Sequence, residues 1–117
     1  MNIDLNDYKK LIVWQKAISL VENVYRMTRS FPKEEIFGLV SQMRRCAVSI
    51  PSNIAEGSRR TSIERKNFLR IAFGSASELE TQIEIGRRLE YIDMKTFENS
   101  SELLTEVLKM LNKMIHY

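Results

Sequence analysis

Glycine and proline, the residues that most often end helices and form turns, are scarce in this chain. Four glycines and two prolines occur among 117 residues, whereas average usage would supply about fourteen of the two together. A chain with so few turn residues makes few turns, which disfavours β-sandwiches and β-barrels. The length fits one domain and is enough to bury a core without metal or disulfide cross-links. We therefore expect a single domain over residues 1–117.

Hydrophobic residues recur at three- and four-residue spacing in four stretches, which is the period of one face of an α-helix. This spacing predicts helices over residues 11–29, 32–56, 61–91 and 94–115. Phe37 is among the residues expected on the inner face of the second helix. Because the connections are short, about two to five residues, consecutive helices should be antiparallel neighbours. The predicted fold class is all-α, an antiparallel up-down-up-down four-helix bundle.

The two prolines have different expected roles. Pro32 opens the second predicted helix, where the missing N–H costs nothing. Pro51 lies inside that helix and lacks the N–H that would bond the carbonyl of Ala47, so we expect a kink there. Gly57 is suited to end the helix. Around the kink, Asn53 and neighbouring serines can hydrogen-bond backbone groups, a structural role.

Reactive side chains are few. Cys46 is the only cysteine and His116 the only histidine, so we expect neither an intrachain disulfide nor a metal site. Arg44 and Arg45 could lower the pKa of Cys46, but a lone cysteine on an apolar helix face is more often a core residue. Ion pairs one helical turn apart account for the glutamates of the third helix. We therefore expect no enzyme activity, no metal, no cofactor and no small-molecule substrate.

The beginning of the sequence does not resemble a targeting segment. Residues 1–10 are polar and include Asp4 and Asp7, unlike a secretory signal peptide. The apolar run Leu11–Trp14 is far too short to span a membrane. With a single cysteine in addition, these features predict a cytoplasmic protein that makes no membrane contact.

Positive charge is concentrated in the middle of the chain. Residues 44–70 hold seven basic and two acidic side chains, a net charge of +5, while the rest holds eleven basic and thirteen acidic, a net charge of −2. Antiparallel helices would place Arg45 and Arg70 at similar heights. We expect this segment to bind the phosphates of RNA or DNA without reading base sequence. The candidate residues are Arg44, Arg45, Arg59, Arg60, Arg65, Lys66 and Arg70.

Two alternatives to nucleic-acid binding stay open at this point. Arginines on a soluble bundle can be ordinary solvated surface. The same basic face could also belong to a protein-interaction scaffold or accessory subunit that meets an acidic partner.

The composition of the third predicted helix bears on whether the protein forms an oligomer. Residues 68–73 are apolar at five of six positions, and Gly74–Ser77 are all small. Either this helix is well covered by its own bundle, or one face packs against another subunit. Ile71, Ile85 and Ile92 lie off the main apolar stripe and favour the second interpretation.

The middle of the chain resembles a known family. The run QMRRCAVSIPSNIAEG at residues 42–57 is similar to the hallmark of small bacterial four-helix-bundle proteins, including those encoded in intervening sequences of 23S rRNA genes. Further matches occur at residues 13–17, 68–72, 74–75 and 78–82. The resemblance implies a bundle with a kinked second helix and brings no catalytic residues.

The chain is also similar to the accessory variability determinant of diversity-generating retroelements. That relative forms a pentameric, positively charged barrel that binds nucleic acid and a reverse transcriptase. The resemblance therefore implies a homopentamer that binds nucleic acid, with a reverse transcriptase as the kind of protein partner an accessory subunit would meet.

Overall fold

The computed structural model of the chain describes residues 4–117, and these residues form helices and connections only. The four long helices are α1 (Ile12–Thr28), α2 (Ser41–Ser58), α3 (Ser62–Arg88) and α4 (Met94–Ile115). Three short elements precede α1 and α2, namely the 3₁₀ helices η1 (Asp7–Lys10) and η2 (Lys33–Glu35) and the π-helical turn η3 (Ile36–Val40). The prediction of an all-α chain with four long helices is confirmed for the described residues. Within them, no helix is both long and apolar enough to cross a membrane.

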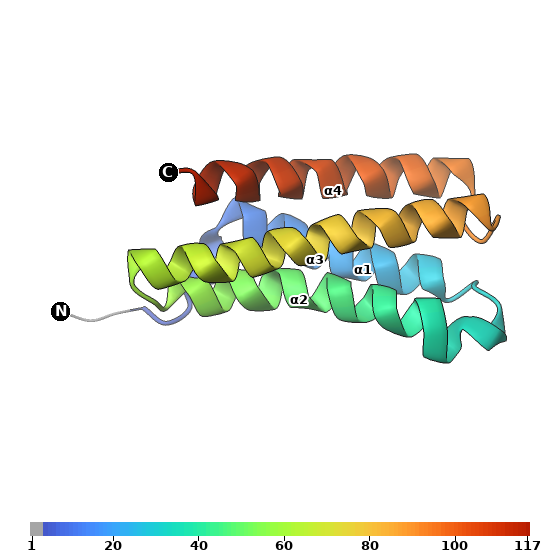
Figure 1. The fold of residues 1–117 in the computed structure, drawn as a ribbon, viewed down its shortest axis with the longest axis horizontal. Helices are drawn as coiled ribbons and strands as arrows, with labels where there is room; N and C mark the ends of the chain where they lie inside the picture. Colours follow the sequence, from blue (N-terminus) through green and yellow to red (C-terminus); the bar gives the residue numbers. More distant parts are fainter. Residues whose placement is uncertain (1–3) are drawn as a thin grey trace.

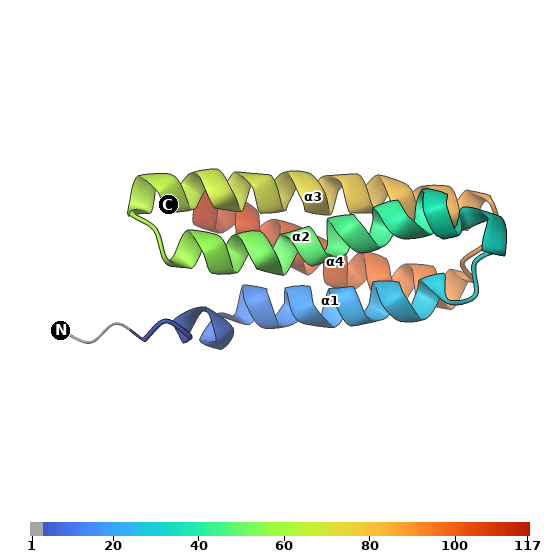
Figure 2. The same ribbon diagram turned by 90° about the horizontal axis from the view of Figure 1, so that it is seen from below.

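The four helices lie side by side along the long axis of a 51 × 23 × 20 Å molecule (Figures 1 and 2). The colours of Figure 1 show the chain reversing direction at each connection, so the α2–α3 connection lies at the same end as η1 and the end of α4. Packed neighbours are α1 with α2, α2 with α3, α3 with α4, and α4 with α1. The seam between α1 and α2 therefore lies across the bundle from the seam between α3 and α4.

The core is formed by one apolar face of each of the four helices. The residues with no exposed surface come from all four helices and include small side chains that let α2 and α3 approach closely. Fully buried positions are Ala17, Leu20, Val24, Met43, Ala47, Ile50, Ala72, Ala76, Leu79, Val107 and Leu111. Ile92 lies in the α3–α4 connection, is only 6% exposed and packs over Gly86 of α3. The expectation that Ile92 faces outward is therefore wrong.

The start of the second predicted helix differs from expectation. The chain does not enter a regular α-helix at Pro32 but passes through η2 and η3 before α2 begins at Ser41. Gly38 has φ −109° and ψ −111°, outside helical geometry. This break turns Phe37 away from the face that begins at Val40. Phe37 is 97% exposed, so its assignment to the inner face is wrong.

Pro51 does not interrupt α2. The helix is continuous from Ser41 to Ser58, and Pro51 is buried within it. Just beyond the carbonyl that the proline leaves without a donor, the Ser52 hydroxyl donates to the carbonyl of Val48 (2.8 Å) and the Asn53 amide donates to that of Ser49 (2.8 Å). These side chains have the local backbone-bonding role expected of them, while a bend of the helix axis at Pro51 stays a prediction.

A polar seam fixes the register of α2 against α3. The hydroxyl oxygens of Ser49 and Ser75 lie 2.9 Å apart, and the Asn53 amide donates to the Ser49 hydroxyl (3.0 Å). One helical turn further from the α2–α3 connection, the Cys46 thiol donates to Glu78 (3.1 Å). Since such contacts form in one alignment only, they oppose sliding of one helix along the other.

Two glycines on this helix pair have opposite environments. A Cβ added to Gly57 would lie 3.0 Å from the Cβ of Phe68 and 3.2 Å from the carbonyl oxygen of Arg65, so the close approach of α2 and α3 requires glycine there. A Cβ added to Gly74 would meet nothing within 4 Å. The packing of this chain thus explains Gly57 and leaves Gly74 on an open face.

These environments predict opposite effects of the same substitution. Gly57→Ala should lower the free energy of unfolding by about 1 kcal/mol or more, because overpacking outweighs the gain in helix propensity. Gly74→Ala should raise it by about 0.5–1 kcal/mol, because alanine favours the helix and meets open space. Urea unfolding followed by circular dichroism measures both. A destabilising effect of Gly74→Ala would show that another chain covers this position.

Candidate nucleic-acid interface

The helix register divides the predicted basic set into two groups. Because Ser49 lies beside Ser75 and Gly57 beside Phe68, Arg70 lies alongside residues 54–55 of α2. Arg45 is about nine or ten residues further along α2, roughly 14 Å at 1.5 Å per residue. The expectation that Arg45 and Arg70 share a height is therefore wrong. Arg44 and Arg45 lie toward the α1–α2 connection, and the other five lie around the α2–α3 connection.

Two arginines of the α2–α3 connection are held by neighbours. The Arg59 guanidinium donates to the carbonyl oxygen of Leu5 (2.9 Å) and lies 5.3 Å from the centre of the Tyr8 ring. Arg60 pairs with Glu56 one turn earlier (2.9 Å) and lies over the Phe68 ring at 5.2 Å. These contacts order the two side chains, and the ion pair cancels the charge of Arg60 in part.

The remaining three cations of this group lie on the first turns of α3. Within residues 4–117, no carboxylate lies within ion-pair distance of Arg65, Lys66 or Arg70. Arg70 donates only to the neutral Asn67 side chain (3.2 Å). Lys66 and Arg70 are one turn apart on the same face, about 6 Å along the helix. These positive charges are available to an external anion.

The N-terminus of α3 is capped by side chains of its own first turn, which limits what it can offer to a bound phosphate. The Thr61 side chain accepts a hydrogen bond from the backbone N–H of Glu64 and so caps α3. The hydroxyl of Thr61 in turn donates to the Glu64 carboxylate (3.2 Å). Because a capping oxygen and a carboxylate already occupy this turn, an incoming phosphate would meet side-chain cations rather than free backbone N–H groups.

The fold adds cations that sequence reasoning missed. Both η1 and the end of α4 lie at the same end as the α2–α3 connection (Figures 1 and 2). We call this end, comprising residues 4–10, 56–70 and 109–117, the basic end. It holds nine basic side chains against four carboxylates, a net charge of +5. The basic ones are Lys9, Lys10, Arg59, Arg60, Arg65, Lys66, Arg70, Lys109 and Lys113, and the acidic ones are Asp4, Asp7, Glu56 and Glu64.

Carboxylates at the basic end are largely engaged. Asp4 and Asp7 lie 3.9 and 3.4 Å from the Lys10 ammonium, and Glu56 pairs with Arg60. A backbone N–H donated by Asn6 is the main reason that the pKa of Asp4 lies below its ordinary value. The sequence did indicate that the chain ends add cations to this end of the bundle. Antiparallel helices bring both chain ends to the connection between the second and third helices.

Arg44 and Arg45 differ from each other. The Arg44 Nε donates to the Thr28 hydroxyl (3.0 Å), and its guanidinium lies 4.5 Å from the centre of the Tyr25 ring. Arg44 is therefore half-buried and fixed against α1. Arg45 is exposed and makes no ion pair among the described residues.

Cys46 is a core thiol. It is 8% exposed, donates to Glu78 and accepts from the Gln82 amide (3.5 Å). Burial, followed by the hydrogen bond to Glu78, raises the pKa of the Cys46 thiol to about 11. The neighbouring arginines do not offset this effect, so the group is a weak nucleophile at neutral pH.

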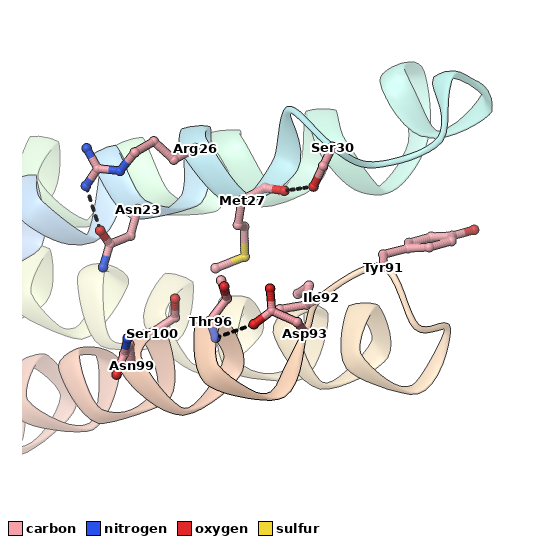
Figure 3. A pocket seen from close by; sticks show the side chains of 10 residues that line it. All are labelled: Asn23, Arg26, Met27, Ser30, Tyr91, Ile92, Asp93, Thr96, Asn99 and Ser100. Carbon is pink, nitrogen blue, oxygen red and sulfur yellow. Dashed lines mark hydrogen bonds between the residues drawn. The ribbon is translucent and has the colours of Figure 1, made fainter.

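The pocket in Figure 3 holds about 400 Å³ beside the end of α1 and the start of α4. Two pairs of its polar residues are bonded to each other: Arg26 donates to Asn23 (2.8 Å), and the backbone N–H of Thr96 donates to Asp93 (2.8 Å). That backbone bond lowers the pKa of Asp93, which caps α4.

The other ionisable candidates have structural partners. The predicted bond between Arg88 and Glu84 is present (2.8 Å), and Arg87 bonds the same carboxylate. These two arginines lower the pKa of Glu84. His116 lies 2.7 Å from the carbonyl oxygen of Asn112. No group of three or more metal-ligating side chains occurs in the part of the chain that the structure describes.

Comparison with known proteins gives a family and a structural relative. Residues 9–113 match the profile of the family described as 23S rRNA-intervening sequence protein. The fold is similar to the 1.70 Å crystal structure of a protein of unknown function from the S23 ribosomal protein family of Bacteroides thetaiotaomicron VPI-5482. That alignment has a TM-score of 0.81 and 26% sequence identity, and it covers 91% of this chain and all of the other. No curated protein sequence matches the chain.

The environment of Cys46 predicts slow labelling. At pH 8, a thiol with a pKa of about 11 instead of the ordinary 9.0 is ionised about a hundredfold less. Alkylation by iodoacetamide at pH 8 should therefore be at least about a hundredfold slower for the folded chain than for the chain unfolded in guanidinium. Equal rates in the two states would refute the assignment of Cys46 to the core.

Proposed function

The chain belongs to the family of 23S rRNA-intervening sequence proteins, and on this basis we propose that it is a non-enzymatic protein that binds RNA or DNA as an oligomer. The basic end carries the proposal. A net charge of +5 gathers there from three separate stretches of sequence, on a chain whose total is only +3. A polyanion is the ligand that such a surface favours.

Phosphates are the part of the nucleic acid that the basic end would contact. Arg65, Lys66 and Arg70 need not break an ion pair to bind a phosphate. Each phosphate that a side chain neutralises releases a counterion, which supplies most of the binding free energy at low salt. Arg59, already fixed against Tyr8 and Leu5, would lose little conformational freedom on binding.

Base-specific recognition is not part of the proposal. Long basic helices that enter a groove, and sheets with stacking aromatic residues, are the usual devices for reading bases. At the basic end the cations are instead spread over η1, the α2–α3 connection, the first turns of α3 and the end of α4. Binding should follow charge and shape, so RNA and DNA of similar length should bind with similar affinity.

Oligomerisation is the second part of the proposal, and a homopentamer is the form that the family resemblance suggests. Support comes from the open face of α3, where Ile71 is 52% and Ile85 42% exposed. Several copies would place several basic ends on one particle. Multivalent contact with one nucleic-acid strand then raises the apparent affinity without any new type of contact.

Removing two unpaired cations tests the basic end. The double variant Lys66→Gln, Arg70→Gln should bind a 30-nucleotide RNA more weakly, and the slope of log K against log salt should fall by about 1–2. The matched control is Arg26→Gln, Lys95→Gln, which removes one arginine and one lysine at the opposite end. Fluorescence anisotropy between 50 and 300 mM KCl measures both variants.

An equal loss of affinity in the control variant would contradict assignment of the site to the basic end. Binding of the original protein that is insensitive to salt would contradict the phosphate mechanism. Poly-glutamate that competes as well as RNA of equal charge would support the protein-scaffold alternative instead.

A further inference from the structure

Phe37 is an aromatic side chain with almost no cover. It is 97% exposed, and its neighbour Ile36 is 50% exposed. Both line a groove of about 800 Å³ between α1 and α2, at the end of the bundle opposite the basic end, together with Val48, which is 41% exposed. Contiguous exposed apolar groups of this kind are typical of a protein–protein contact.

The charged side chains that line this groove are all basic. Four basic side chains line it and no carboxylate does, which gives a lining charge of +4. None of the four makes an ion pair within residues 4–117. They are Arg29, Lys33, Arg44 and Arg45.

A second groove lies across the bundle, between α3 and α4. It holds about 580 Å³ and has an apolar wall made by Ile85 and Phe97. Its charged lining residues are Glu80, Glu84 and Arg88, a net charge of −1. Glu84 already bonds Arg87 and Arg88, whereas Glu80 makes no ion pair within residues 4–117. The α3–α4 groove thus offers an apolar surface and one unpaired carboxylate, that of Glu80, to the cations of the α1–α2 groove.

The two grooves lie at the same height along the bundle. Tyr91, in the α3–α4 connection, donates to Glu35 (3.1 Å), and Phe31 lies beside Gly86. These contacts place the segment that carries Phe37 level with the end of α3 and the start of α4, as Figure 2 also shows. A neighbouring copy placed alongside, without a shift along the axis, would bring the two grooves together.

We propose that Phe37 of one copy inserts into the α3–α4 groove of a second copy. The cations around Phe37 then face Glu80 of that copy, and Ile85 packs against the inserted ring. The contact uses different surfaces on its two sides, so a pair of copies keeps one free groove of each kind, the α3–α4 groove of the first copy and the α1–α2 groove of the second. Such heterologous contacts continue from copy to copy and close into a ring when the rotation permits.

A second copy explains more of the structure than a nucleic acid in the same groove. Bases could stack on Phe37 and phosphates could meet its arginines. That ligand would leave Ile85 and the α3–α4 groove uncovered, whereas a second copy covers both apolar surfaces. The inference rests on the oligomeric part of the proposed function and is independent of the basic end.

Mixing two interface variants tests the contact. Phe37→Ser and Ile85→Glu each alter one groove at an exposed position, so both chains should fold, which circular dichroism verifies. Each variant alone should elute as a monomer of 13.7 kDa in size-exclusion chromatography with light scattering. An equimolar mixture should give a particle of twice that mass, because the Phe37 of one variant meets the intact groove of the other.

The control is Ile63→Ser, a side chain 79% exposed on the first turn of α3 at the basic end. This variant should keep the mass of the original assembly. A mixture of the two interface variants that stays monomeric would overturn the proposal, as would either variant keeping the original mass or an original protein that is monomeric. Normal mass combined with weakened RNA binding in Phe37→Ser would identify a stacking site instead.

The readouts separate this inference from the basic-end proposal. Lys66→Gln, Arg70→Gln should leave the mass unchanged while lowering the salt slope. Phe37→Ser should change the mass and leave the salt slope per chain unchanged. Each proposal can therefore fail while the other stands.

Discussion

The contact between α2 and α3 determines where every functional surface of this bundle lies. Small buried side chains bring the two helices close, Gly57 allows the approach near the connection, and the hydrogen bond between Ser49 and Ser75 permits one register. Apolar packing alone tolerates sliding by a helical turn, but a polar pair that loses its partner costs about 1–3 kcal/mol. The register therefore follows from a few polar atoms in a mostly apolar seam.

That register separates the charges of the middle segment into two surfaces. Arg59–Arg70 join η1 and the end of α4 at the basic end, while Arg44 and Arg45 join Phe37 at the opposite end. One end of each subunit would then serve nucleic acid, and the other end would serve assembly. This division would give a chain of 117 residues two kinds of contact.

Helix content and core could be predicted from sequence because apolar periodicity is a local property. The misassignments have non-local causes. Phe37 fits the period, but the backbone break at Gly38 rotates it outward. Ile92 does not fit the period, yet it is buried because Gly86 leaves room for it. The lysines of η1 and α4 are distant in sequence from residues 56–70, and only the arrangement of the helices brings them to the basic end. A charge count along the sequence therefore does not find them.

Ultraviolet cross-linking of the assembled protein to a uniformly labelled RNA, followed by mapping of the cross-linked peptides, shows which end of the bundle holds the nucleic acid. Binding at the basic end predicts cross-linked peptides from residues 56–70 and from η1, where Tyr8 and Phe68 lie beside arginines. It predicts none from the segment that carries Phe37. Cross-links concentrated at residues 29–48, or spread evenly over the helices, would contradict the assignment of nucleic acid to the basic end.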